Sequence, residues 1–269
     1  MLADVIPIEF EHIAIAFHVD DLLAWDRLLR AELGGEASLG GVVPANDFQG
    51  GQITYAGGGM LELLTWVGGA DSKSAMQRYV EKQGGRGAVH HLTFLIGDFE
   101  EAVERCRALG YEPMIGRNGR NWREFFVRDP GLRPKGMLIQ VLQANKQALI
   151  SESGWDADWE PFAAEYPEVR TPVRIAGIQL ASVDPTASRR LFEELLAAEA
   201  EEGTDGPVLR WPASSMRVRL VESADPADTF IEIHAPGDSG PAELTSSIGA
   251  GEHPESASGL LRPIEAPPA

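Results

Sequence analysis

Two histidines and two side chains with oxygen donors recur at matching places in the first half of the chain. His12 and His91 lie 79 residues apart, and Glu62 and Gln140 lie 78 residues apart. Each histidine stands in an alternating apolar run typical of a β-strand, and each oxygen donor stands in another such run. Two imidazoles, one carboxylate and one amide oxygen suit a divalent transition metal, and this mixed set does not choose among zinc, iron, cobalt, nickel and manganese.

The period of a strand limits which other histidines can join this set. His90 adjoins His91 and must therefore point to the opposite face of the strand. His18 shares a face with His12 but lies about 20 Å further along an extended chain. The small Ala14 and Ala16, also on the His12 face, are expected to leave room for a ligand.

Each of these residues can also be explained without a metal ion. A histidine in a buried strand is commonly a hydrogen-bonded core residue. Glu62, between Leu61 and Leu63, could face water on a half-exposed strand. The repeat offset shared by all four residues favours a metal site at His12, Glu62, His91 and Gln140.

The four residues belong to a repeated order of elements. A strand is followed by an amphipathic helix, a glycine that ends the helix, and further strands. The predicted segments of the first repeat are strand 11–17, helix 22–33, and strands 50–56 and 60–66; those of the second are strand 89–94, helix 99–109, and strands 121–127 and 136–142. Each repeat is interpreted as a βαβββ module of an α+β fold. Pairing of the two modules into a curved open barrel would bring the four side chains together.

A third, degenerate βαβββ module is predicted further along the chain. Its segments are strand 174–180, helix 188–200, and strands 215–222 and 229–235. Gly177 stands where the other modules have histidine, and Glu232 is matched to Glu62. The predicted organisation is 1–145 for the paired modules with the metal site, 146–171 for a connector, 172–237 for the third module, and 238–269 for a tail rich in Pro, Gly and Ser. Because a lone module must cover an open sheet edge, we expect a homodimer.

Composition excludes several classes of function. The formal charge of −18 and the sequence pI near 4.7 argue against a nucleic-acid partner, which needs a basic face. No apolar run reaches the length of about 18–20 residues that a membrane span requires. The start of the chain has no basic region typical of a signal peptide. The single cysteine, Cys106, fits a reducing compartment, and the expected location is cytoplasmic.

The first half of the chain resembles the vicinal-oxygen-chelate superfamily, and within it the methylmalonyl-CoA epimerase-like members. The resemblance covers about residues 9–144 and rests on EHIAIA, MLELL, SKSAMQRYVEKQGGRGAVHHLTF and WREFFVRDPGLRPKGMLIQVL. It implies paired βαβββ modules whose first and last strands supply the metal ligands, here His12, Glu62, His91 and Gln140. The last of these positions usually holds glutamate, and in the epimerase a glutamine stands at the position of Glu62. Carboxylate and amide are therefore exchanged in this chain.

The resemblance implies an enzyme that binds a small molecule through a divalent metal. The leading hypothesis is a glyoxalase-type isomerase or lyase that acts on an α-carbonyl, hydroxy-acid or acyl-thioester compound through a metal-stabilised enolate, with Glu62 as the catalytic carboxylate. Tyr55 and Glu124 are further candidates for proton transfer.

We expect Tyr55, Arg123 and Phe125 to contact the substrate. The basic run from Arg117 to Lys135 is either a site for a carboxylate or phosphates, or an ordinary solvated hairpin.

Two other functions remain open. His12, His91 and Glu62 also make the two-histidine, one-carboxylate set of an iron(II) extradiol-type dioxygenase. A non-catalytic small-molecule binding or resistance protein would use the same residues as pocket lining and would need no metal.

Overall fold

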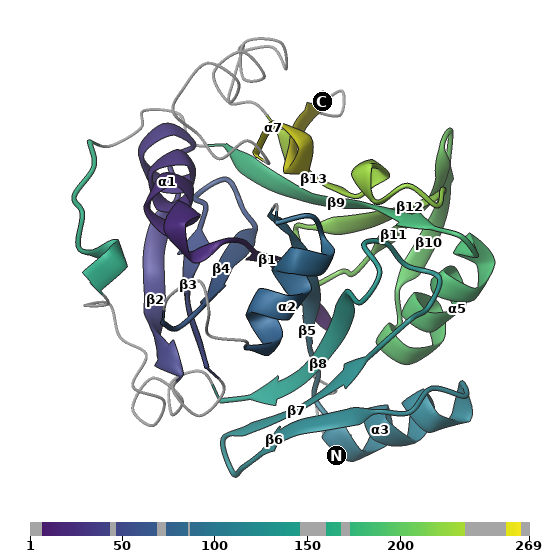
Figure 1. Cartoon of the computed structure of the whole chain (residues 1–269). Coiled ribbons are helices and arrows are strands. Elements are labelled where there is room, and N and C mark those ends of the chain that lie inside the picture. Colours follow the sequence, from purple (N-terminus) through teal and green to yellow (C-terminus); the bar gives the residue numbers. More distant parts are fainter. Residues whose placement is uncertain are drawn as a thin grey trace. The chain divides into compact units, whose positions relative to one another are not determined.

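The computed structural model describes residues 7–43, 47–68, 74–85, 87–145, 160–167, 173–234 and 257–264. The strands are β1 (Glu9–Ala16), β2 (Glu36–Val43), β3 (Phe48–Thr54), β4 (Met60–Trp66), β5 (Ala88–Leu95), β6 (Met114–Asn118), β7 (Trp122–Val127), β8 (Leu138–Ala144), β9 (Arg174–Ser182), β10 (Glu199–Gly203), β11 (Gly206–Arg210), β12 (Arg217–Glu222), β13 (Phe230–His234) and β14 (Leu261–Ile264). The helices are α1 (Leu22–Asp26), which continues as the π-helical η2 (Arg27–Glu32), α2 (Ala75–Lys82), α3 (Phe99–Ala108), α5 (Pro185–Leu196), α7 (Ala257–Leu260) and the short η1 (Val19–Asp21), η4 (Glu160–Phe162) and η5 (Pro226–Asp228) (Figure 1). The predicted α+β fold of βαβββ modules is confirmed, and most of the predicted connector and tail lies outside the described residues.

The first two modules have the same internal strand order. In the eight-stranded sheet the order is β2-β3-β4-β1-β5-β8-β7-β6, so the first strand of each module neighbours its own fourth strand. Both of these neighbour pairs are parallel, with Ala14 opposite Glu62 and Thr93 opposite Gln140. In each module the histidine therefore stands two residues before the residue that faces the oxygen donor. The repeat offset found in the sequence reflects this shared register.

The third module contains strands other than those predicted for it. The six-stranded sheet has the order β10-β11-β12-β9-β13-β14, so β9 to β12 form a complete module. α5 ends at Leu196, where Ala197 adopts a left-handed backbone conformation with φ of 51°, and the polar β10 and β11 follow. The sequence pattern had extended this helix to residue 200, into the start of β10, and had missed both strands.

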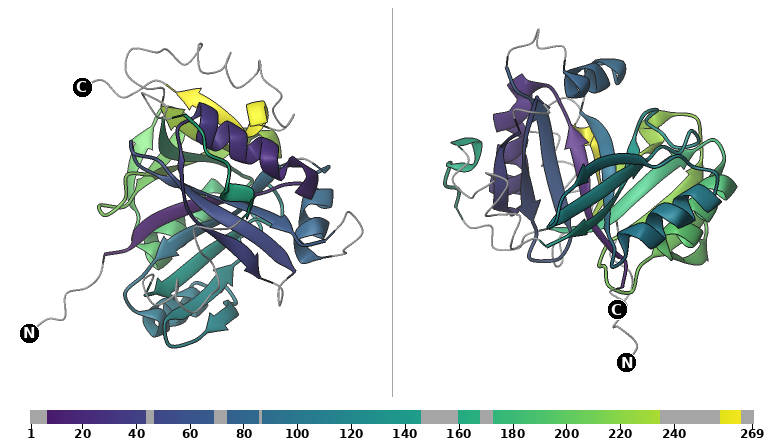
Figure 2. Two further views of the ribbon diagram at one scale, coloured as in Figure 1. Left: turned by 90° about the vertical axis from the view of Figure 1, so that its left-hand side faces the viewer. Right: turned by 90° about the horizontal axis from the view of Figure 1, so that it is seen from below.

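The match of Glu232 to Glu62 is consequently wrong. Its strand, β13, neighbours the first strand of the third module and pairs in parallel with β14, as a first strand pairs with a fourth strand (Figure 2). β13 and β14 thus begin a partial fourth module, and β14 forms within the predicted tail. β13 occupies one edge of β9, and the expected homodimer stays a prediction.

The chain divides into two compact units, whose boundary runs through β1, β5 and β9. Unit 1 comprises Met1–His12, His91–Ser153 and Ile178–Thr229, and unit 2 comprises Ile13–His90, Gly154–Gly177 and Phe230–Ala269. Unit 1 thereby contains most of the second and third modules. Unit 2 contains most of the first module together with β13 and β14.

An aromatic cluster forms the centre of unit 1. Phe10 stacks on Phe94 with 4.8 Å between ring centroids, and Trp211 lies 4.8 Å from Phe94 and 6.2 Å from Phe192. The indole Nε1 of Trp211 donates to the carbonyl of Leu196 at 2.7 Å, which satisfies the polar atom of this buried side chain. The cluster joins the strands that carry the candidate ligands of unit 1 to the third module.

A buried polar network fastens the β7–β8 connection to the third module. The Asp129 carboxylate accepts a hydrogen bond from the Ser188 hydroxyl at 2.6 Å, and Ser188 lies 2.8 Å from the hydroxyl of Ser182. The other carboxylate oxygen of Asp129 accepts from the backbone N–H of Gly131 at 2.8 Å. Because buried polar groups are costly when unsatisfied, this network fixes the loop that precedes β8.

In unit 2, helix α2 packs against the last residues of β1 and β4. Ala14, Ala16, Trp66, Met76 and Tyr79 belong to one buried cluster with Leu64 and Val80. Both alanines are fully buried, so the space expected beside them for a ligand is filled by helix side chains. None of the described helices combines the length and apolar character that crossing a bilayer requires.

The aromatic cluster predicts a large loss of stability on truncation. We expect Trp211→Ala to lower the free energy of unfolding by about 3–5 kcal/mol, because it removes a buried indole and leaves a cavity. Urea unfolding followed by circular dichroism measures this loss. Leu23→Ala, at a site that is 66% exposed, is the control and is expected to change stability by less than about 0.5 kcal/mol. Equal stability of the two variants would contradict this assignment of the core.

Candidate metal centre

His12 and His91 are buried and lie face to edge, and both belong to unit 1. Their ring centroids are 5.6 Å apart at an interplanar angle of 66°, and their residues are only 2% and 5% exposed. His12 comes from β1 and His91 from β5, and these first strands of the two modules are neighbours in the sheet. The predicted meeting of the two histidines is therefore present in the structure.

Glu11 orients the imidazole of His12. Its Oε2 lies 3.0 Å from Nδ1 of His12, and an ionised carboxylate can only accept hydrogen bonds. The contact therefore places a proton on Nδ1 and, in the neutral imidazole, leaves the lone pair on Nε2. A carboxylate on the second ring nitrogen is the usual arrangement behind metal-binding histidines.

Gln140 is held at the centre of a hydrogen-bond network in the same unit. The hydroxyl of Thr93 donates to Gln140 Oε1 at 2.6 Å and lies 2.8 Å from His12 Nε2. The amide Nε2 of Gln140 donates to Glu124 Oε2 at 2.7 Å. The amide oxygen of Gln140 is thereby directed toward His12 through Thr93.

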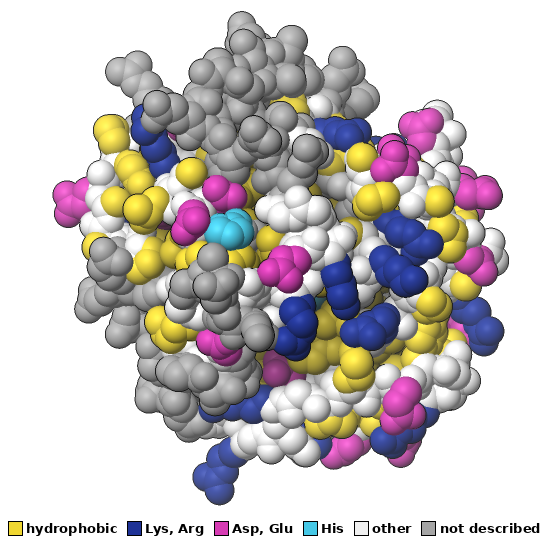
Figure 3. Space-filling model, viewed as in Figure 1, with side chains coloured by type: hydrophobic (Ala, Val, Ile, Leu, Met, Phe, Trp, Pro, Cys, Tyr) yellow, Lys and Arg dark blue, Asp and Glu magenta, His cyan; other side chains and the backbone are white. Residues whose placement is uncertain are grey.

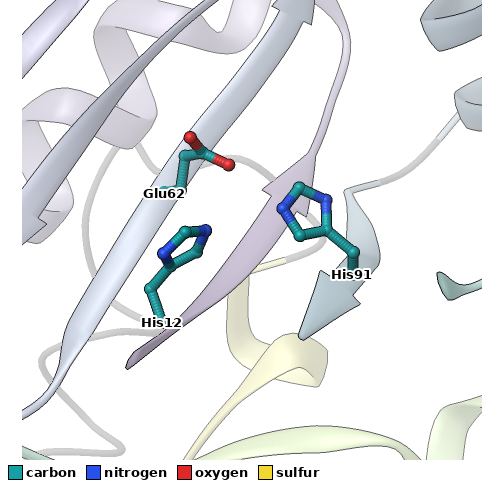
Figure 4. Close-up of side chains that lie close together, drawn as sticks. All are labelled: His12, Glu62 and His91. Atoms are coloured by element: carbon teal, nitrogen blue, oxygen red, sulfur yellow. The ribbon is translucent and has the colours of Figure 1, made fainter. Parts of the chain in front are cut away.

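Glu62 is placed by the pairing of β4 with β1. It stands opposite Ala14, two residues after His12 on the same strand, and is 7% exposed. One donor atom from each of His12, Glu62 and His91 lies within 4.8 Å of the others. In the close-up the carboxylate and the two rings point toward one another (Figure 4).

The donor set fits a divalent transition metal. Nitrogen and oxygen ligands at about 2.0–2.2 Å from one ion lie no more than about 4.4 Å apart, so small side-chain rotations would bring the three donors into range. The Thr93 hydroxyl lies within hydrogen-bond distance of both Gln140 Oε1 and His12 Nε2, and so links the amide to the imidazole. An ion there would be held by His12, His91 and Glu62, with the oxygen of Gln140 adjacent.

The three predicted substrate contacts are engaged away from this network. Tyr55 is 5% exposed, its hydroxyl donates to the carbonyl of Leu29 at 3.3 Å, and burial raises the pKa of its phenol. Arg123 donates to Asn118 at 2.8 Å and lies 4.1 Å over the ring of Phe99. Phe125 is fully buried against the same ring of Phe99 in α3. Arg123 and Phe125 therefore occupy the face of β7 that packs on α3.

The opposite face of β7 carries the side chains that meet the histidines. Phe126 pairs with Gln140 across β7 and β8, and its ring lies 6.2 Å from that of His91. Glu124, two residues earlier, shares this face and binds Gln140. Strand alternation separates Glu124 and Phe126 from Arg123 and Phe125, and the register of β7 on β8 shows that the first pair meets Gln140. Glu11 and Thr93 were missed as well, and only their closeness to the histidines in sequence signalled them.

The neighbouring histidines lie outside the cluster, as predicted. His90 points to the other face of β5, where its ring contacts that of Tyr79 with 4.8 Å between centroids. His18 caps η1 by accepting from the backbone N–H of Asp20 at 3.3 Å and lies against Trp66.

Part of the basic run has structural partners. Arg133 donates to the backbone carbonyls of Pro130, Gly131 and Leu132, and Arg123 donates to Asn118 and Glu100. These contacts stabilise the β6–β7 hairpin and the loop before β8. Lys and Arg side chains also gather near the centre and right of the face drawn in Figure 3.

Comparison with known proteins supports the fold. No protein-family model and no curated protein matches the sequence. A 4-hydroxymandelate synthase variant from Streptomyces coelicolor is 14% identical, with a TM-score of 0.56 over 90% of this chain and 74% of that one. A xylose isomerase-like TIM barrel/4-hydroxyphenylpyruvate dioxygenase fusion protein is 15% identical, with a TM-score of 0.58 over 94% of this chain and 43% of that one.

A methylmalonyl-CoA epimerase from Mycobacterium tuberculosis matches a shorter part of this chain. It is 21% identical, with a TM-score of 0.41 over 55% of this chain and 96% of that one. The likeness to the 4-hydroxymandelate synthase variant and to the fusion protein is one of fold, and it agrees with the predicted βαβββ modules.

The cluster predicts that His91 is needed for metal binding and that its neighbour is not. We expect protein purified without chelator to carry about one divalent ion per chain, and His91→Ala to weaken binding at least about tenfold through loss of one ligand. Elemental analysis and competition with a chromogenic chelator measure both quantities. His90→Ala, one residue away on the other strand face, should bind metal like the parent. Equal effects of the two substitutions, or metal-free parent protein after reloading, would contradict the site.

Proposed function

We propose that the protein is a metal-dependent isomerase or lyase of the glyoxalase type. Its substrate would be a small α-carbonyl, hydroxy-acid or acyl-thioester compound. The observation that carries the proposal is the buried group of His12, Glu62 and His91, whose donor atoms lie within 4.8 Å of one another. A bound divalent ion would draw charge from a substrate carbonyl and so stabilise the enolate formed when a neighbouring proton leaves.

Glu62 is the residue of this group that can accept such a proton. It is the carboxylate among the three clustered side chains, whereas Gln140, at the equivalent place in the second module, is a neutral amide. Glu62 is only 7% exposed and lies beside the two histidines. We propose that Glu62 abstracts the proton beside the carbonyl and returns it to the enolate.

Helix α2 limits where a substrate can lie. Its residues Met76, Tyr79 and Val80 pack against Ala14 and Ala16 in one buried cluster of unit 2. The proposed substrate therefore does not extend over these alanines, which favours a compact reacting group over a long chain inserted along β1.

A second candidate function has specific support. His12, His91 and Glu62 match the ligand set of non-haem iron(II) oxygenases. One protein of similar fold is a fusion that contains a 4-hydroxyphenylpyruvate dioxygenase, with a TM-score of 0.58. An iron(II) extradiol-type dioxygenase therefore remains the alternative, and a binding or resistance protein without catalysis is the outcome if neither reaction is found.

Proton exchange separates these functions. In D2O, the metal-loaded protein should exchange the hydrogen beside the carbonyl of compounds from the proposed classes, which proton NMR detects without identification of the final product. We expect Glu62→Gln to slow this exchange by at least about 100-fold, because an amide cannot accept the proton. Metal content is measured in the same samples, and Glu101→Gln on the exposed face of α3 is the control.

Oxygen consumption is recorded with the iron(II)-loaded protein and a series of catechols. Oxygen uptake without α-proton exchange would replace the isomerase proposal by the dioxygenase. Ligand binding without either reaction would support the non-catalytic function.

A further inference from the structure

Glu124 is anchored on the face of β7 that meets Gln140. Its Oε2 accepts hydrogen bonds from the indole Nε1 of Trp122 at 2.7 Å and from Gln140 Nε2 at 2.7 Å. Its Oε1 accepts from the backbone N–H of Arg117 on β6 at 3.2 Å. Three donors from three different residues thus hold this carboxylate in one position within unit 1.

This anchored carboxylate determines which way the Gln140 amide faces. An ionised carboxylate accepts hydrogen bonds and donates none, so the NH2 group of the amide must face Glu124. The oxygen of the amide then faces Thr93, whose hydroxyl donates to it at 2.6 Å. The reversed amide would set its oxygen against the carboxylate and its NH2 group toward His12, where it could not bind a cation.

The first module lacks both of these restraints. The position equivalent to Thr93 is Ala14, since Ala14 stands opposite Glu62 as Thr93 stands opposite Gln140. The position equivalent to Glu124 is Gly50, which stands opposite Leu64 as Glu124 stands opposite Leu142. A Cβ atom at Gly50 would lie 2.5 Å from the carbonyl oxygen of Leu63, so a side chain does not fit there.

We propose that Glu124 is a positioning residue that fixes the Gln140 oxygen as a donor toward the metal site. Together with Thr93 it makes Gln140 the rigid, neutral side of the centre. Ala14 and Gly50 stand at the equivalent positions beside Glu62. This inference rests on the proposed metal-dependent function, but the orientation of the amide is a property of the metal-free protein and can be tested separately.

The first test measures the amide directly in metal-free protein. We expect the side-chain NH2 of Gln140, assigned by its loss in Gln140→Glu, to exchange its hydrogens slowly in nitrogen-15 NMR spectra. Glu124→Ala should accelerate this exchange at least about tenfold, because the acceptor that protects the NH2 group is removed. Glu124→Gln keeps an oxygen acceptor and should restore exchange to within about threefold of the parent.

The second test measures metal affinity with Zn²⁺ and the visible spectrum of the Co²⁺-loaded protein. Glu124→Ala should weaken Zn²⁺ binding by about 10–100-fold, as loss of a group behind a metal ligand typically does. Glu124→Gln should bind Zn²⁺ within about threefold of the parent and keep the parent Co²⁺ spectrum. Arg123→Ala, adjacent on the opposite face of β7, is the matched control and should leave both readouts unchanged.

The outcomes separate the inference from the proposed function. Parent-like Zn²⁺ affinity and amide exchange in Glu124→Ala would overturn the positioning role. Weak binding by Glu124→Gln equal to that of Glu124→Ala would overturn it as well, because charge rather than orientation would then matter. A parent protein that binds no metal but shows the expected amide protection would refute the metal-dependent function alone. If Glu124→Ala is unfolded by circular dichroism, Thr93→Val replaces it and must reduce Zn²⁺ affinity, with parent-like affinity counting against the inference.

Discussion

The parallel pairing of first and fourth strands within each module is the constraint on which the candidate site depends. It places Ala14 opposite Glu62 and Thr93 opposite Gln140, and each pair lies two residues beyond a histidine. A shift of one residue in either pairing would turn the oxygen donor to the opposite face of the sheet. The buried core holds these registers, because β4 is buried along its whole length and a slip would force side chains of other sizes into the packing positions on both of its faces.

The two modules then use this common register for different purposes. In the second module, Thr93 and Glu124 bind a neutral amide at both ends, so its oxygen has one fixed direction. In the first module, Ala14 and Gly50 occupy the corresponding positions, and the oxygen donor is a carboxylate. Symmetry of the fold thus supplies the convergence of the donors. Departures from symmetry in the side chains make one oxygen donor an anchored amide and the other a carboxylate.

The sequence predicted the site better than it predicted the surroundings of the site. The spacing of His12, Glu62, His91 and Gln140 was readable because identical strand order imposes identical offsets on polar residues in apolar runs. Arg123 and Phe125, predicted to contact the substrate, lie on the face of β7 that contacts Phe99 of α3, and which face of β7 meets Gln140 depends on a register that the sequence does not show. Glu11 and Thr93 act through hydrogen bonds to other side chains, and such contacts leave no periodic signal.

The third module shows a second limit of pattern reading. β10 and β11 are short, and β10 is mostly glutamate and exposed, so neither strand gave an apolar alternation. β13 was accordingly assigned as the last strand of the third module, whereas it is the first strand of the partial fourth module. The strand itself was predicted correctly. Order in a sheet depends on hydrogen bonds between distant segments, and a single missed strand changes the role of every strand after it.

The central claim is that one divalent ion sits among His12, His91 and Glu62. Anomalous diffraction from crystals of the zinc-loaded protein, recorded on both sides of the metal absorption edge, tests it most directly. The account predicts a single strong anomalous peak about 2.0–2.2 Å from a nitrogen of each imidazole and from a carboxylate oxygen of Glu62. A fully loaded crystal with no peak between these side chains, or with its ion bound elsewhere on the chain, would contradict it.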